Sequence, residues 1–454
     1  MSEPVPSGPL ENGSDRPPVL RDRSFWGMII TQFLGAFNDN LYKQMMLLMA
    51  IPAAGMAAGA QTDLQGWATL VFSLPFVLFS GYAGYLSDRY SKTPIIVACK
   101  VAEIVIMLLG LAAFYYYDLF GMTGTWVVLF LMATQSAFFG PGKYGILPEL
   151  FRPQDLPRAN GLMLMTTFLA IIFGVVAAGG LKKALAGGEA GRPQDLAVAM
   201  LVCVGIAVAG TLSSLMIRRV PPAQPGAKLT IDALAISRDV WHLLQRDRTL
   251  LGALLVSSLF WMVSGMAAPT VNRLGLDMLG QTEFGASFLS AFIAFGIMVG
   301  AVLAGVLCRR GWSDRCVTIG LSGICGCLFL LGIWMGGNQH LLGFYGSIVG
   351  LFALGVFAAV FAIPIQVFLQ ARPPSTLKGR MIATMNQANF IGILISGPLY
   401  QLFEAISRWL EWPICSVFWM MMLLVAPVAA CYRLRSAAQP AAGPADTTPQ
   451  DGVH

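Results

Sequence analysis

The chain has 454 residues, of which 56% are hydrophobic and only 11% are charged, with a net charge of +6. A soluble domain has about 25% charged residues, and the 49 glycines of this chain fit helices that approach closely inside a membrane. The composition predicts an all-α integral membrane protein and excludes a soluble enzyme, a secreted disulfide scaffold and a disordered regulator.

Twelve apolar segments follow one another along the chain, each near the roughly 20 residues that are needed to cross a bilayer. We expect membrane-spanning helices at 25–52, 65–87, 94–117, 122–141, 159–181, 195–217, 249–271, 284–308, 315–336, 341–370, 378–403 and 411–434. The polar ends, 1–23 and 436–454, are predicted to be disordered cytoplasmic tails. Because no cleavage site follows the first apolar run, we expect it to be retained as a span and not removed as a signal peptide.

The longest gap between the segments divides them into two groups of six. We predict an N-terminal six-helix bundle at 24–217, a cytoplasmic linker at 218–248 and a C-terminal six-helix bundle at 249–435. Apolar residues recur at helical spacing between Ile231 and Leu244, which predicts an amphipathic helix on the membrane surface within the linker.

Positively charged residues and a short repeat indicate the topology. With both ends on the cytoplasmic side, 22 of the 29 Lys and Arg residues fall inside, five fall outside, and Lys43 and Lys100 lie within spans. This bias predicts cytoplasmic termini and explains the net charge without a nucleic-acid partner. Arg152-Pro153 and Arg372-Pro373 precede the fifth and eleventh segments, which favours two parallel repeats, as in one large transporter architecture.

Cysteine and histidine patterns favour neither a metal centre nor an enzyme. The eight cysteines lie in or beside apolar runs without a CxxC pair or a Cys/His cluster, and no histidine lies in mid-span. His242 and Asp247 have the His-x4-Asp spacing of glycerolipid acyltransferases, but five residues subtend about 140° on a helix, so the side chains would not converge. We expect no catalytic residue, no metal and no cofactor.

Polar residues within the spans are candidates for a substrate site, because such groups are costly in hydrocarbon unless they line a cavity or find a partner. The first span contains Asn38, Asp39, Asn40, Lys43 and Gln44. Asp39 and Lys43 are four residues apart, on one helical face, and are expected to pair. The pair either lines a substrate cavity or is purely structural.

Three further sets of polar residues allow two interpretations each. Lys100 and Glu103, three apart in the third span, are expected to pair in a functional or a structural role. Lys143 follows the fourth span in a Gly/Pro-rich turn, where a cation and free amides suit a phosphate, although it also fits a positive-inside anchor. Neutral amides in or beside the spans fit ligand contacts or interhelical hydrogen bonds; they are Asn160, Gln366, Gln370, Asn386, Gln387 and Asn389.

The strongest local motif lies between the second and third spans and reads Gly84-Tyr85-Leu86-Ser87-Asp88-Arg89-Tyr90-Ser91-Lys92-Thr93-Pro94. Gly84 permits close helix approach, Asp88 can cap a helix or pair with a cation, and Arg89 and Lys92 hold the turn on the cytoplasmic side. The motif resembles the signature loop of the major facilitator superfamily. That resemblance implies twelve helices in two six-helix pseudo-repeats, with the loop gating the conformational change.

A narrower resemblance, to bacterial lysophospholipid transporters, covers nearly all of 25–435. The segments that carry it are Gln32–Asn40, Gly140–Glu149, Ala159–Met163, Leu259–Trp261 and Lys378–Thr384 with Asn386 and Asn389. The last segment resembles the transporter portion of proteins that are fused to an acyltransferase and an acyl-carrier-protein ligase. The chain departs from the pattern at Leu164, where some members have Glu, and in span seven, which has no basic residue in its interior and only Arg273 near its outer end.

The resemblance implies a secondary transporter that moves lysophospholipids, chiefly lysophosphatidylethanolamine, across the bacterial inner membrane toward the cytoplasm for re-acylation. It implies a monomer in the bilayer, with a separate cytoplasmic acyltransferase/acyl-carrier-protein ligase as a partner. The alternatives are a proton-coupled drug or small-metabolite antiporter, with Asp39 or Glu103 as the coupling carboxylate, and a non-transporting scaffold for an acyltransferase. Candidate substrate-binding residues are Asp39, Lys43, Asn38, Asn40, Lys143 and Asn386.

Overall fold

The computed structural model describes residues 19–51, 63–151, 155–186, 192–222, 238–310, 312–336, 339–374 and 377–434. Within these ranges the chain is helical and has no strand apart from one isolated bridge between Trp334 and His340. Ten helices are long and apolar enough to cross a membrane. Two more complete a set of twelve: α1, which carries polar residues in its middle, and α15, which has 16 residues. The predicted all-α membrane fold is confirmed.

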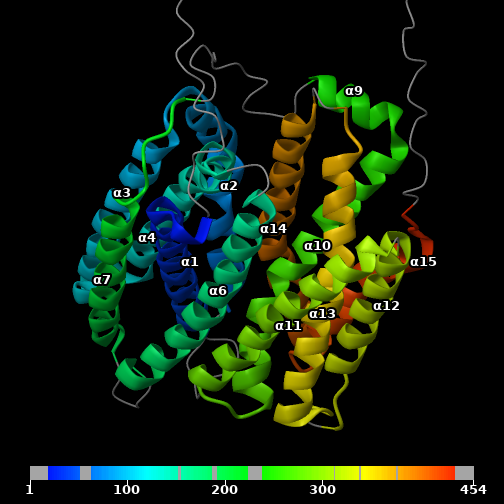
Figure 1. Cartoon of the computed structure of the whole chain (residues 1–454). Coiled ribbons are helices and arrows are strands. Elements are labelled where there is room, and N and C mark those ends of the chain that lie inside the picture. The colour runs from blue at the N-terminus through cyan, green and yellow to red at the C-terminus, as the bar shows by residue number, and fades with distance from the viewer. Residues whose placement is uncertain are drawn as a thin grey trace, which may run out of the picture.

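The twelve long helices form two groups of six (Figure 1). We call the first group the N half; it contains α1 (Arg23–Met49), α2 (Gln65–Arg89), α3 (Lys92–Tyr115), α4 (Tyr117–Gly145), α6 (Leu156–Ala186) and α7 (Ala197–Ser214). We call the second group the C half; it contains α10 (Arg248–Arg273), α11 (Glu283–Arg309), α12 (Ser313–Leu331), α13 (Gly343–Ala371), α14 (Lys378–Trp409) and α15 (Ser416–Cys431).

Short helical segments connect the long helices. They are η1 (Val19–Arg21), α5 (Leu147–Leu150), η3 (Pro193–Leu196), α9 (Arg238–Arg246) and η4 (Leu274–Met278), the last of which is a π-helical turn that extends α10. In α9, Val240 and Leu244 are buried against the C half, whereas Trp241 and His242 are exposed. This helix forms the second part of the predicted amphipathic helix; residues 231–237 and most of the predicted tails lie outside the described residues.

Asp247, the second residue of the His-x4-Asp spacing, has a structural role at the start of α10. Its Oδ1 accepts hydrogen bonds from the Thr249 and Leu250 amides at the start of α10, and its Oδ2 accepts one from Arg372 Nε at 2.5 Å. Burial alone would raise the pKa of this carboxyl, but the hydrogen bond from Arg372 and those from the two amides outweigh burial and leave the pKa below its usual value. Asp247 is a helix cap that joins α10 to the end of α13.

The two halves meet along two helix pairs, α2 with α14 and α6 with α11. Gly66 and Gly397 allow the first crossing, because a Cβ on either residue would overlap the carbonyl oxygen of the other. Gly179 allows the second, since its Cβ would meet Ser287 and the backbone of Glu283. All these glycines lie toward one end of the molecule, where α1 ends and α2 begins.

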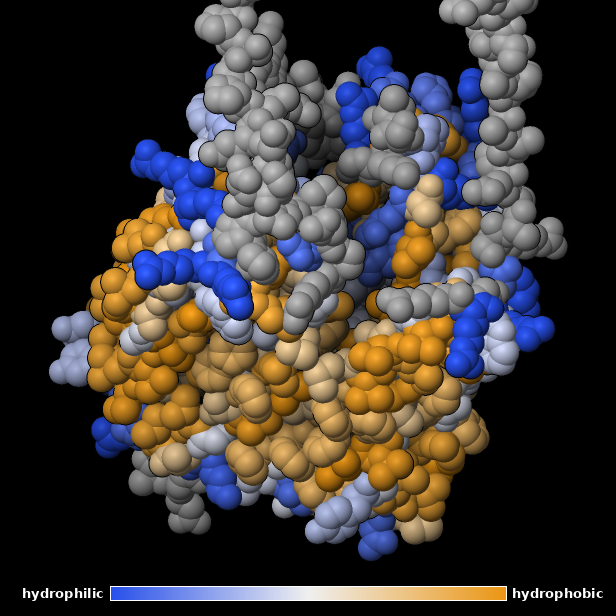
Figure 2. Space-filling model, viewed as in Figure 1, coloured by the Kyte–Doolittle hydropathy of each residue, from blue (hydrophilic) through white to orange (hydrophobic). Residues whose placement is uncertain are grey.

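The two ends of the molecule differ in charge and in shape. We call the end where α1 starts at Arg23, α2 ends at Arg89 and α3 starts at Lys92 the basic end; it is the upper end in Figure 1, which also carries α9. Figure 2 shows hydrophilic residues at both ends, an apolar belt between them and a hollow between the two halves at the basic end. The molecule is therefore open toward the basic end, and we call the other end the closed end.

Candidate functional site

Asp39 and Lys43 on α1 do not form the predicted ion pair. Asp39 Oδ2 accepts a hydrogen bond of 2.5 Å from Ser136 Oγ on α4, whereas Lys43 Nζ lies 4.5 Å from the centre of the Phe72 ring on α2. The prediction of a pair was wrong because α4 and α2 each provide one of the two side chains with a different neighbour. The i, i+4 spacing places both residues on one face of α1, but it does not by itself make their side chains bond.

Both charged groups therefore lack a bonded counter-charge. Among the described residues, no carboxylate lies within ion-pair distance of Lys43, and Asp39 Oδ1 is buried without a hydrogen-bond partner. Asp39 interacts electrostatically with Glu103, Lys100 and Lys143, but none of them is bonded to it. A carboxylate and an ammonium without a bonded counter-charge inside a membrane helix are candidates for a substrate site.

Lys100 and Glu103 form the expected pair on α3, with 2.5 Å between Lys100 Nζ and Glu103 Oε2 and 1% of each side chain exposed. Asn38 Nδ2 donates to the other carboxylate oxygen, Glu103 Oε1, at 2.9 Å and to the Cys203 carbonyl at 3.3 Å. These bonds lie in the interior of the N half, between α1, α3 and α7. Asn38 thus faces the neighbouring helices α3 and α7.

Lys143 lies inside α4 and not in a turn after it. The helix continues through Pro141 to Gly145, and the Gly142 carbonyl accepts a bond from the Ile146 amide. The predicted loop of free amides was wrong, because membrane helices tolerate proline when neighbouring groups satisfy the backbone. The Lys143 ammonium is nearly buried and donates to Thr167 Oγ1 on α6 at 3.0 Å.

Two further candidates are placed differently from Asp39 and Lys43. Asn40 Nδ2 donates to the Ala36 carbonyl of its own helix at 2.8 Å. Asn386 is exposed on α14, in the C half, and no described residue forms a hydrogen bond with its side chain. Its neighbour Asn389 is the interhelical residue, since it accepts a bond of 2.9 Å from Ser257 on α10.

The motif between α2 and α3 holds the basic end of the N half together. Lys92 is buried and forms an ion pair with Glu149 on α5. Arg89 bonds to Tyr85 Oη and lies over that ring. Asp88 is exposed and, among the described residues, neither caps α3 nor forms an ion pair. Glu149, the partner of Lys92, is not part of the signature loop and lies 57 residues further along the chain.

The closed end contains a polar network that sequence reasoning missed. Asp63 Oδ2, just before α2, accepts a bond of 2.6 Å from Tyr400 Oη on α14 and lies 3.1 Å from Arg273 Nη1 on α10. Arg273 also pairs with Asp277 and lies 3.9 Å from Glu404. Residues more than 200 positions apart thus join the two halves, and no local pattern indicates such a contact.

Further hydrogen bonds extend this network toward α11. Gln44 Nε2 donates to Asn272 Oδ1 at 2.8 Å, and Asn272 Nδ2 donates to Gln65 Oε1 at 2.9 Å. Lys182 on α6 forms an ion pair of 3.0 Å with Glu283 on α11. The network around Asp63, the separate Lys182–Glu283 pair and the glycine crossings together seal the closed end.

Comparisons with known proteins agree on fold and family. The family model of the Major Facilitator Superfamily matches residues 21–397. The Lysophospholipid transporter LplT of Salmonella typhimurium is 30% identical over 398 residues, which cover 85% of this chain and 90% of that protein. The protein of the same name from Klebsiella pneumoniae is 28% identical over 401 residues, with the same coverage.

Solved structures of low sequence identity have the same fold. The POT family transporter PepTSo superposes with a TM-score of 0.69 at 13% identity, covering 90% of this chain and 96% of that one. FucP, a Major Facilitator Superfamily transporter in the outward conformation, gives a TM-score of 0.59 at 14% identity, covering 89% and 97%.

Proposed function

Because the chain belongs to the Major Facilitator Superfamily, we propose that it is a secondary transporter that moves lysophospholipids across the membrane by alternating access. Its similarity to proteins named Lysophospholipid transporter LplT, over 85% of its length, supports this substrate class. The structural observation that carries the proposal is the pair of uncompensated charges on α1, Lys43 over Phe72 and Asp39 beside Ser136.

A zwitterionic headgroup would satisfy both charges at once. The Lys43 ammonium suits the phosphate, and the unpartnered Asp39 Oδ1 suits the ammonium of an ethanolamine headgroup. Lys143 is a second cation in electrostatic reach of Asp39, and Asn38, Asn40 and Asn386 remain proposed contacts. Bound in this way, the headgroup crosses the apolar belt with its charges compensated, which lowers the cost of moving it through the membrane.

The charge bias supports the orientation of this transporter. With the basic end in the cytoplasm, the hollow in Figure 2 faces the cytoplasm and the closed end faces outward. We place the protein in the bacterial inner membrane as a monomer that delivers lysophospholipid to the cytoplasmic side for re-acylation by a separate acyltransferase/acyl-carrier-protein ligase. The loop that contains Gly84, Asp88, Arg89 and Lys92 gates the conformational change.

The proposal is tested with the full chain in vesicles that contain labelled lysophosphatidylethanolamine. We expect saturable flux that empty vesicles lack, and a fall of about tenfold per folded molecule in Lys43→Met and Asp39→Asn, which corresponds to about 1.4 kcal/mol. Lys183→Met, which changes an exposed lysine on α6, is the matched control and should keep wild-type flux.

Two results would contradict the proposal. If the wild-type protein moves no lysophospholipid but binds an acyltransferase, it is a scaffold; if it exchanges drugs or metabolites for protons, it is an antiporter. If the wild type transports lysophospholipid and both Lys43→Met and Asp39→Asn keep its flux, the substrate site does not lie at these residues of α1.

A further inference from the structure

A pocket of about 180 Å³ lies at the closed end of the C half, where α10 and α14 end and before α15 begins. Four charged side chains and one aromatic ring line it; they are Arg273, Asp277, Glu404, Arg408 and Trp412. We call it the polar pocket. Arg273 belongs both to this pocket and to the network around Asp63, so a ligand in the pocket can act on the contact between the halves.

The ion pairs of the polar pocket are open to exchange with a ligand. Arg408 Nη2 lies 2.9 Å from Glu404 Oε2, and 49% of the Arg408 side chain is exposed. Asp277 pairs with Arg273 and is 36% exposed. Water screens an ion pair that has an exposed partner, so such a pair contributes little to stability. A ligand that brings its own charges can therefore replace these contacts at a small cost.

The charges around the polar pocket favour a zwitterion over a simple anion. Asp63 joins the two carboxylates of the lining, so that three carboxylates of the described residues surround the guanidinium groups of Arg273 and Arg408. This cluster has one negative charge in excess and would repel an anion. A group with a phosphate and an ammonium adds no net charge and pairs with both signs. The exposed ring of Trp412 also suits an ammonium.

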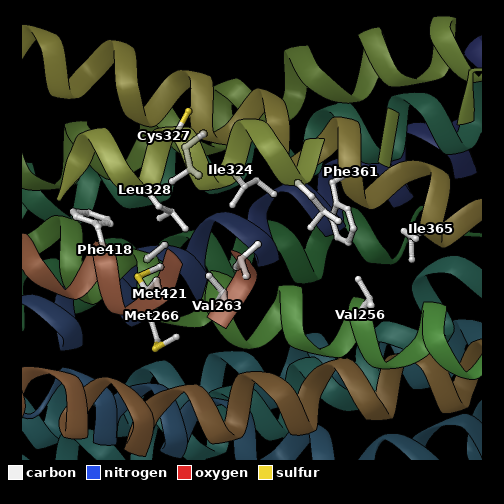
Figure 3. Close-up of a cluster of buried hydrophobic side chains, with 14 of the residues drawn as sticks. Val256, Val263, Met266, Ile324, Cys327, Leu328, Phe361, Ile365, Phe418 and Met421 are labelled. Atoms are coloured by element: carbon white, nitrogen blue, oxygen red, sulfur yellow. The ribbon is translucent and has the colours of Figure 1, made fainter. Parts of the chain in front are cut away.

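The size of the polar pocket fits a headgroup and not an acyl chain. A water molecule takes up roughly 30 Å³ in the liquid, so the pocket has the room of about six waters. The interior of the C half beyond it is apolar, as Figure 3 shows for Val263, Ile324 and Met421. A charged group would lose its hydrogen bonds there, so its way inward from the pocket lies between the two halves.

Arg273 connects the polar pocket to the contact between the halves. Its Nη1 atom lies 3.1 Å from Asp63 Oδ2, and the Asp63 side chain is fully buried. A phosphate that binds Arg273 competes with Asp63 for the same guanidinium. Because a ligand shifts a conformational equilibrium toward the state that it binds better, binding in the pocket favours the open arrangement of this end.

The polar pocket is also adjacent to the proposed site on α1. Gln44, which follows Lys43, donates a hydrogen bond of 2.8 Å to Asn272, which precedes Arg273. One hydrogen bond thus joins the neighbour of the proposed phosphate ligand on α1 to the neighbour of the pocket arginine. When the closed end opens, the way of a headgroup from Arg273 to Lys43 leads along this contact.

We propose that the polar pocket is the first binding site for the headgroup of a lysophospholipid that arrives from outside, and that this binding separates Arg273 from Asp63 and opens the closed end. Arg273 and Arg408 hold the phosphate, and Asp277 and Glu404 hold the ammonium. The inference rests on the proposed function and goes beyond it by adding a second site for the substrate and a cause for the opening of the closed end.

A cysteine placed where the halves meet reports the opening. Ser287 is fully buried where α6 crosses α11, so in a background without native cysteines the rate at which Ser287→Cys reacts with a water-soluble thiol reagent measures how often this end opens. We expect lysophosphatidylethanolamine, and at higher concentration the soluble glycerophosphoethanolamine, to raise this rate about tenfold, a usual size for coupling between two sites. Inorganic phosphate and ethanolamine, each alone, should leave it unchanged. Acceleration by the lipid only, or by inorganic phosphate alone, would overturn the inference.

Removal of one ion pair of the pocket provides a second test. Arg408→Gln together with Glu404→Gln takes away both charges, so that no buried charge loses its partner. We expect this double variant to lose the acceleration and to need about tenfold more lysophospholipid for half-maximal flux. Lys43→Met should lose flux but keep the acceleration, and Arg192→Gln, at an exposed arginine outside the pocket, is the control that should keep both. Unchanged acceleration in the folded double variant would overturn the inference, whereas absence of wild-type flux would contradict the proposed function.

Discussion

Gly35 is the residue that makes room for the buried charge of the N half. A Cβ at this position would overlap the Lys100 ammonium, which is itself nearly inaccessible to solvent. Glu103 forms an ion pair with Lys100 there, and Asn38 bonds to the same carboxylate. The absence of a side chain on α1 thus allows an ion pair on α3 to lie between α1, α3 and α7.

We expect Gly35→Ala to destabilise the folded protein by about 1–3 kcal/mol, because the added methyl group overpacks a site that contains a charged side chain. Thermal unfolding in detergent measures this effect. Gly205→Ala on α7, where a Cβ would meet nothing within 4 Å, is the control and should be neutral or slightly stabilising. Equal melting temperatures for the two variants would show that Lys100 is not confined as described.

At the closed end, polar contacts join helices of the two halves near their ends. Asp63 accepts hydrogen bonds from Tyr400 on α14 and from Arg273 on α10. One carboxylate thus connects the beginning of α2 to two helices of the C half. Opening this end requires both contacts to break. The carboxylate is fully buried, and a buried charge that loses its partner is strongly destabilising, which favours the closed arrangement.

Asp63→Asn keeps an acceptor for Tyr400 but removes the charge that attracts Arg273, so we expect the closed end to open more often. Nitroxide labels at Leu119 and Tyr345, both exposed at this end of α4 and α13, report the separation of the halves by electron paramagnetic resonance in a background without native cysteines. We expect a longer-distance population to grow.

Asp118→Asn is the matched control, since Asp118 bonds to Gln194 within the N half. It should leave the distance distribution unchanged. An unchanged distribution in Asp63→Asn as well would mean that the glycine crossings alone hold this end closed.

On the scale of the whole molecule, one end is sealed and the other is hollow. The halves meet through α2 with α14 and through α6 with α11. The network around Asp63 and the Lys182–Glu283 pair lie at the closed end of these helix pairs. Transport by alternating access requires the halves to separate at this end and to approach at the basic end.

A covalent link across the closed end should therefore stop transport. Lys182 and Glu283 form an ion pair between α6 and α11, and cysteines at both positions, joined by a short bifunctional thiol reagent, should abolish flux per folded molecule. Each single-cysteine variant treated with the same reagent should retain its flux. Transport by the cross-linked protein would argue against separation of the halves at α6 and α11.

The helices could be predicted from the amino-acid sequence alone, because a bilayer requires each segment to satisfy its own backbone hydrogen bonds. The fourth span, expected at 122–141, is part of α4 (Tyr117–Gly145), and the eleventh, expected at 378–403, begins α14 (Lys378–Trp409). The Lys100–Glu103 pair was also predictable, since its partners share one turn of one helix.

Which polar groups meet between helices could not be predicted from the sequence, because it depends on how the helices pack. Asp39 lies beside Ser136, Lys43 lies over Phe72, and Asp63 joins Arg273 across 210 positions of the chain. The spacing of Asp39 and Lys43 allows them to pair. Their actual partners depend on which faces of α2 and α4 pack against α1. That choice is made by the packing of whole helices, which involves many apolar contacts at once and leaves no signal at the polar residues themselves.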